Sequence, residues 1–164
     1  MDPRELKSKL ANGGKVYGTM LWAIDSARMA SFLDNEHLDY AIIEAEHAPR
    51  TLYQINAMTT ALRNKNITSI VRITSPNPEI AGATIDAGAD GILVPYCEDI
   101  EELKLSFGRT YFNPLKGEYL KKVLDEGKFP SKKSEDYLRE KSKSRLFILG
   151  IESVPAVNNL EKMI

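Results

Sequence analysis

The chain of 164 residues is 43% hydrophobic and carries 22 basic and 23 acidic side chains, for a net charge of −1. A chain of this length buries one sizeable core, so we expect a single domain over residues 1–164, and the balanced charge excludes a global field for nucleic acid or an anionic membrane. Without an apolar run of roughly 18 residues or a signal peptide, we expect a cytoplasmic protein with small-molecule partners.

Short apolar runs alternate with amphipathic stretches along the chain, which predicts five βα units. The predicted strands cover residues 15–20, 40–46, 68–73, 91–95 and 145–152. The predicted helices that follow them cover residues 26–35, 52–65, 78–87, 100–109 and 155–163. The single cysteine, Cys97, follows the fourth strand and is interpreted as a packing residue, and it excludes an intramolecular disulfide and a multi-cysteine zinc site.

Alternating βα units indicate an α/β fold with parallel strands and right-handed crossovers. Two architectures fit this pattern, a doubly wound open sheet and a β/α barrel. The segment at about 113–144 breaks the alternation and is rich in Lys and Glu. We interpret it as a helical excursion, with helices at 118–125 and 134–142, that forms a solvated insertion or, alternatively, a lid or subunit contact.

Polar residues end the second predicted strand, where ligands gather in parallel βα folds. Glu44, Glu46 and His47 lie at this exit. Period-two alternation places both glutamates on one face and His47 on the other face or in the turn. Two carboxylates this close require a cation or a positive side chain nearby. His47 is either an acid/base group or a residue that caps the loop before Pro49.

The third and fifth predicted strands also end in charged residues. Arg72 has a planar guanidinium that suits a carboxylate, and its partner is either a protein carboxylate such as Glu44 or Glu46, or the carboxylate of a substrate. Glu152 either caps the helix that follows it or supplies an oxygen ligand to a hard divalent cation. Position in the sequence does not decide between these alternatives.

Four motifs occur in a fixed order: Glu-His-Ala-Pro at 46–49, Val-Arg at 71–72 with Asn-Pro shortly after, Asp-Ala-Gly-Ala-Asp-Gly-Ile-Leu-Val-Pro at 86–95, and Ile-Glu at 151–152. In this order and spacing they resemble the class II pyruvate aldolases of the HpcH/HpaI type, which cleave 4-hydroxy-2-oxo acids to pyruvate and an aldehyde. The resemblance implies a (β/α)8 TIM barrel of the pyruvate/phosphoenolpyruvate-binding type, of which this chain holds about five βα units. It also implies a homo-oligomer.

The resemblance also implies roles for individual residues. His47 would be the acid/base group, with Glu44 and Asp86 as the carboxylates that support it. Arg72 would hold the pyruvyl carboxylate and stabilise the enolate oxygen. Glu152 would be one ligand of a divalent cation, Mg²⁺, Mn²⁺ or Co²⁺, bound to the 2-oxo acid.

The sequence departs from the family pattern at several points. Glu44 stands where Asp is usual, and Gly150 stands where Gln is usual. The aromatic residue expected after the first-strand glycine is absent, although Trp22 is close, and the loop from Asn113 replaces a Gly/Arg-rich one. The family's second metal-binding carboxylate belongs to the strand after Ile164, so we expect an incomplete metal site. A non-catalytic, self-associating barrel fragment and a related acyl-CoA lyase remain alternative functions.

Overall fold

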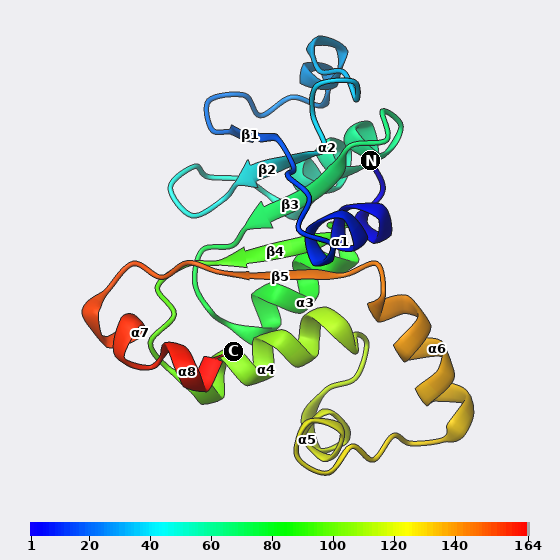
Figure 1. The fold of residues 1–164 in the computed structure, drawn as a ribbon, viewed down its shortest axis with the longest axis vertical. Helices are drawn as coiled ribbons and strands as arrows, with labels where there is room; N and C mark the ends of the chain where they lie inside the picture. Colours follow the sequence, from blue (N-terminus) through cyan, green and yellow to red (C-terminus); the bar gives the residue numbers. More distant parts are fainter. Residues whose placement is uncertain (164) are drawn as a thin grey trace.

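The computed structural model describes residues 1–163 and contains a five-stranded parallel sheet (Figure 1). The strands are β1 (Gly18–Leu21), β2 (Tyr40–Glu44), β3 (Thr68–Arg72), β4 (Gly91–Val94) and β5 (Leu146–Leu149). Their spatial order β1-β2-β3-β4-β5 is also their order in the sequence. A doubly wound sheet reverses its order at a switch point, so this unbroken order is that of a barrel wall.

One face of the sheet is covered by the helices that connect the strands. These are α2 (Leu52–Arg63), α3 (Pro78–Asp86) and α4 (Ile100–Tyr111). Each begins at a side-chain cap, supplied by Thr51, Asn77 and Asp99. Alternate strand residues point under these helices and form the main core, in which Ile43 and Val71 are fully buried.

The other face of the sheet is less well covered. Its apolar residues Ile42, Leu93 and Ile148 are only partly buried. Helix α1 (Pro3–Ala11) lies across this face in Figure 1, and its Leu6 packs against Ile70 of β3. The inner side of the barrel wall is therefore partly open among the residues that the structure describes.

The segment predicted as an excursion contains α5 (Gly117–Glu126) and α6 (Lys132–Ser142), which Figure 1 shows beside α4 and away from the sheet. Leu120 and Val123 form the buried side of α5. No helix among residues 1–163 is long and apolar enough to cross a membrane.

Two predicted helices differ from those in the structure. The first predicted helix is a 3-10 helix, η1 (Ala27–Phe32), because only Met29 and Ala30 reach the core and Phe32 is 85% exposed. The last one is divided into α7 (Val154–Asn158) and α8 (Leu160–Met163). The break falls at Asn159, whose side chain donates a hydrogen bond to the Glu98 carbonyl. Both predictions of continuous α-helix were therefore wrong.

Candidate active site

The pairing of β2 with β3 brings Glu44 and Arg72 together. They are register partners at the carboxyl ends of the two strands. Arg72 Nε donates to Glu44 Oε2 at 2.5 Å, and Arg72 Nη1 lies 3.2 Å from Glu46 Oε2. Both glutamates thus lie on the face that alternation predicts, and Arg72 has protein carboxylates as its partners in this structure.

Glu44 is completely buried, and its other oxygen, Oε1, accepts the backbone N–H groups of Glu46 at 2.7 Å and His47 at 2.8 Å. Burial by itself would raise the pKa of Glu44. The hydrogen bond and positive charge of Arg72, with the two backbone N–H groups, outweigh burial and hold this pKa below its ordinary value. Glu44 is therefore ionised at neutral pH, and it fixes both Arg72 and the turn that carries His47.

Glu46 lies between Arg72 and His47. Its Oε2 atom is 3.2 Å from Arg72 Nη1 and 3.6 Å from His47 Nε2, yet it accepts no hydrogen bond among residues 1–163. The His47 side chain is 58% exposed, so its ring is open to a ligand. This arrangement keeps a basic ring beside a carboxylate whose lone pairs are not fully used.

An aromatic side chain from the end of β1 completes the cluster. The Trp22 ring centroid lies 5.6 Å from the Arg72 guanidinium carbon and 5.9 Å from the His47 ring centroid. Arg50 donates to the carbonyls of Glu44 at 2.6 Å and Trp22 at 2.7 Å. The loops after β1 and β2 are thereby held side by side.

Two cavities border Glu46 at this edge of the sheet. One of about 460 Å³ is lined by residues including Thr74, Tyr96 and Glu98. The other, of about 520 Å³, is lined by the turn that carries His47. Either is large enough for a small-molecule substrate.

Asp86 does not lie with the other predicted residues. It is the last residue of α3, which runs antiparallel to the strands, and it accepts a hydrogen bond from Asn113 at 2.6 Å near the end of α4. Both residues lie toward the amino ends of the strands, whereas His47 lies at the carboxyl ends. Within one chain Asp86 therefore forms its hydrogen bond with Asn113 and not with His47 among residues 1–163, and its supporting role stays a prediction.

Glu152 follows β5, and its Oε2 accepts the backbone N–H of Tyr96 at 3.3 Å. The cap of α7 is Ser153, whose hydroxyl accepts from Ala156, so Glu152 does not have the capping role. Its oxygens are of the type that hard divalent cations prefer. Among residues 1–163, however, no three His, Cys, Asp or Glu side chains gather into a group that could hold a metal ion.

Comparison with known proteins gives the family. A model of the HpcH/HpaI aldolase/citrate lyase family matches residues 19–164. The chain belongs to this family.

Several curated members of the HpcH/HpaI family are similar to the chain. A hydroxypyruvate/pyruvate aldolase of Roseovarius nubinhibens is 33% identical over 99 residues, which cover 60% of this chain and 38% of the relative. A 5-keto-4-deoxy-D-glucarate aldolase of Enterobacter sp. strain 638 is 24% identical over 163 residues, which cover 97% of this chain and 61% of the relative. The chain thus spans less than two thirds of the length of these relatives.

Comparison with solved structures confirms the predicted fold class. An HpcH/HpaI aldolase from Desulfitobacterium hafniense DCB-2 superposes with a TM-score of 0.76 at 25% identity, covering 96% of this chain and 61% of that one. Macrophomate synthase, at 22% identity, has the same fold with a TM-score of 0.71, covering 99% of this chain and 57% of that one. The five parallel strands of this chain match the strands of these barrels.

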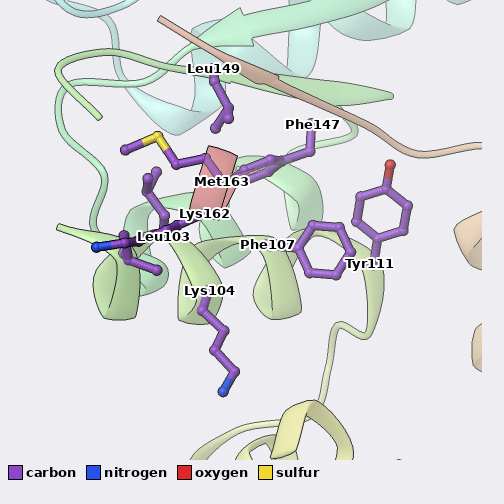
Figure 2. Close-up of a pocket in the computed structure, with 9 residues that line it drawn as sticks. Leu103, Lys104, Phe107, Tyr111, Phe147, Leu149, Lys162 and Met163 are labelled. Atoms are coloured by element: carbon purple, nitrogen blue, oxygen red, sulfur yellow. The ribbon is translucent and has the colours of Figure 1, made fainter. Parts of the chain in front are cut away.

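A further cavity of about 540 Å³ lies between α4, β5 and α8 (Figure 2). Figure 2 shows Phe107 between Tyr111 and Phe147, and the rings of Phe107 and Tyr111 stack at 4.4 Å. Phe147 and Leu149 belong to the helix-covered side of β5. This apolar cavity is therefore separate from the charged cluster of this HpcH/HpaI family member.

The contacts of Arg50 with the ends of β1 and β2 were not predicted from the sequence. Its only signal is its place directly after the Glu-His-Ala-Pro turn, and an arginine in a loop is more often a solvated charge. Trp22 was noticed for its nearness to the first strand, but its contact with Arg72 depends on how the β1 and β2 loops pack. Neither role follows from spacing along the chain.

Proposed function

We propose that the full-length protein to which this chain belongs is a metal-dependent aldolase that cleaves 4-hydroxy-2-oxo acids into pyruvate and an aldehyde. The observation that carries the proposal is the cluster of Arg72, Glu44, Glu46 and His47 at the carboxyl edge of the sheet. Membership of a family of carbon–carbon lyases supports it.

His47 is the acid/base group in this proposal. Its exposed ring borders a cavity and can take the proton of the substrate's 4-hydroxyl group as the bond between C3 and C4 breaks. The electron pair of that bond then forms the enolate of pyruvate, and the former hydroxyl carbon becomes the aldehyde. Protonation of the enolate at C3 releases pyruvate. Glu46, 3.6 Å from His47 Nε2, stabilises the imidazolium formed in the first step.

Arg72 binds the pyruvyl carboxylate in this proposal. Nε and Nη1 face the two glutamates, and Nη2 has no partner in the described part of the chain. That nitrogen is available to a carboxylate oxygen of the substrate. Because Glu44 fixes the plane of the guanidinium, the site is preorganised for the substrate carboxylate and for the enolate oxygen on which charge develops in the reaction.

Glu152 fits the metal role only as a single ligand. Its carboxylate accepts one backbone N–H at 3.3 Å, which leaves its other oxygen without a hydrogen bond among residues 1–163 and available to a hard cation such as Mg²⁺, Mn²⁺ or Co²⁺. When bound, such a cation supplies Lewis-acid stabilisation of the enolate oxygen. Residues 1–163 form no group of three potential metal ligands. The remaining ligands would therefore be water or side chains from the rest of the full-length protein.

The proposal includes self-association into a homo-oligomer. Exposed aromatic side chains on the outer, helical side support this, Phe32 of η1 and Tyr53 of α2, because exposed apolar surface favours interfaces. Light scattering with size-exclusion chromatography measures the assembly state of the full-length product.

A pyruvate-release assay coupled to lactate dehydrogenase tests the activity. The full-length gene product is assayed against a series of 4-hydroxy-2-oxo acids with and without Mg²⁺, Mn²⁺ and Co²⁺. We expect pyruvate release that depends on one of these cations. Cleavage of a hydroxyacyl-CoA ester into a shorter acyl-CoA and a carbonyl compound, with no pyruvate from any oxo acid, would instead support the alternative of a related acyl-CoA lyase.

A further inference from the structure

Among residues 1–163, Arg50 makes three hydrogen bonds, and all of them are to backbone carbonyls. Nε donates to the Glu44 carbonyl at 2.6 Å, and Nη2 donates to the carbonyls of Trp22 at 2.7 Å and Leu21 at 3.0 Å. The contacts of its guanidinium within residues 1–163 are with these carbonyl oxygens, and none is an ion pair with a carboxylate. Its guanidinium therefore joins the ends of two neighbouring strands and does not balance another charge.

These bonds lie where the regular sheet stops. The last register pair of β1 and β2 is Leu21 with Ile43, so Trp22 and Glu44 lie beyond the paired ladder on this side. The planar fork of Arg50 reaches one carbonyl of β2 and two carbonyls at the end of β1 at the same time. An ammonium group lacks this fixed fork and cannot hold both strand ends in the same geometry.

The backbone fixed by Arg50 carries the indole of Trp22. This ring is half exposed, so the core does not hold it in place. It lies 5.6 Å from the Arg72 guanidinium carbon and 5.9 Å from the His47 ring centroid, inclined at 30° to the imidazole. The negative face of an indole ring attracts a guanidinium that lies over it, and the strength of this attraction depends on the position of the ring.

We propose that Arg50 is a positioning residue, which fixes Trp22 against Arg72 and His47 and so sets the geometry of both groups. This inference rests on the proposed function, because the two groups are those assigned to substrate binding and proton transfer. Arg50 itself forms no hydrogen bond or ion pair with either group in the described part of the chain; its hydrogen bonds go to backbone carbonyls.

The chain supplies its own probe, because Trp22 is its single tryptophan. In Arg50→Ala, we expect the Trp22 fluorescence maximum to move to longer wavelength and acrylamide quenching to increase, while the far-UV circular dichroism stays that of the wild type. Arg50→Lys should lie between wild type and Arg50→Ala. In the full-length product, turnover of Arg50→Ala should fall on the order of 10- to 10²-fold, as for a misplaced catalytic group.

The matched control is Arg63→Ala. Arg63 also donates to a backbone carbonyl, that of Gly88 at 2.7 Å, but at the other end of the sheet. Its removal should leave the emission of Trp22 unchanged. Unchanged emission in folded Arg50→Ala would overturn the proposal, and so would unfolding of both Arg50 variants, because Arg50 would then hold the fold and not the indole. Emission is read without substrate, so a wild-type product that releases no pyruvate contradicts the aldolase proposal separately.

Discussion

Two largely buried guanidinium groups lie at opposite ends of the sheet and have different partners. Arg72, at the carboxyl end, faces two carboxylates, and 14% of its side chain is exposed. Arg109, toward the amino end, is 3% exposed and donates to the Asn113 amide oxygen and the Leu115 carbonyl, both at 3.0 Å. The nearest carboxylate to Arg109 belongs to the exposed Glu79, at 3.8 Å.

The difference indicates a structural role for Arg109 and a role in substrate binding for Arg72. The neutral partners of Arg109 belong to the loop after α4, so this guanidinium ties the start of the excursion to the helix layer. Its Nε has no hydrogen-bond partner among residues 1–163. Arg72 has a compensated charge beside open cavities, where an incoming anion can compete for it. Substitutions at the carboxyl end should therefore change chemistry, and those near the amino end should change stability.

The largest expected effect is that of His47→Ala in the full-length product. We expect turnover to fall on the order of 10² to 10⁴-fold, as for loss of a general acid or base. The melting temperature should stay close to that of the wild type, because the side chain is mostly exposed. Steady-state pyruvate release and isothermal titration with pyruvate measure the two properties. Loss of pyruvate binding in a folded variant would make His47 a ligand-binding residue.

Arg72→Lys tests the other half of the carboxyl-end cluster. An ammonium keeps the charge but not the fork, so we expect a loss of about 1.5 to 3 kcal/mol of transition-state stabilisation, roughly 10- to 150-fold in rate. The measurement is kcat/KM for pyruvate release, with Arg63→Lys as the control at the other end of the sheet. Activity within about twofold of the wild type would rule out Arg72 as the anion-binding residue, because the loss of one charged hydrogen bond should reduce the rate by much more.

Gly82→Ala tests the opposite end. A Cβ atom at residue 82 would lie 2.1 Å from Arg109 Nη2, and this guanidinium is buried and hydrogen-bonded and so cannot swing away freely. We expect a loss of about 1 to 3 kcal/mol in the free energy of unfolding, as for an overpacked core. Chemical denaturation of this variant and of Ala83→Gly, its helical neighbour, measures the effect. A fully stable Gly82→Ala chain would show that the network around Arg109 is adaptable.

Glu44→Gln should change the pH dependence of stability. The pKa of Glu44 in the folded chain is below its ordinary value of 4.5, so the ionised carboxylate stabilises the fold above that value, and this contribution is lost as the pH falls through the folded value. Wild type should therefore be more stable than Glu44→Gln at pH 7, with the difference shrinking under acid conditions. Melting temperatures between pH 7 and pH 3 measure it, and a constant difference would contradict the assignment.

The smallest expected signal is metal binding by the 164-residue chain. Glu152 is a single ligand, and the nearby glutamates face Arg72, so we expect Mn²⁺ to bind more weakly than about 10⁻⁴ M, as for sites with few charged ligands. Isothermal titration with Mn²⁺, repeated with Glu152→Gln, measures it. Micromolar affinity would show that a complete metal site exists within these residues.

Much of the fold was predictable because it depends on local patterns. Each of the five predicted strands overlaps an observed one, and the parallel order follows from the helices between them. Helix α1 was missed because it has few apolar residues, although Asp2, Pro3 and Glu5 supply a capping box and a proline at the first turn. Its helix signal lay in the caps and not in hydrophobic periodicity.

The candidate site was predictable only where neighbours in space are also register partners. Glu44 and Arg72 end adjacent parallel strands, so their meeting follows from the order of the sheet. The role of Asp86 came from the family resemblance and not from strand register, and the residue closes a helix toward the amino end of the sheet, as the predicted helix over 78–87 implies. The contacts of Trp22 depend on loop packing, which no period along the sequence encodes.

The register of β2 with β3 also limits how the gene can change over evolution. A single-residue insertion or deletion within either strand would turn Glu44 or Arg72 toward the helix layer and would expose the residues that now form the core. Such a change would disrupt the core and the charged cluster together, so a variant that loses only its activity or only its stability is not expected. Length variation should therefore accumulate in the loops outside these two strands, and changes within them should be restricted to substitutions.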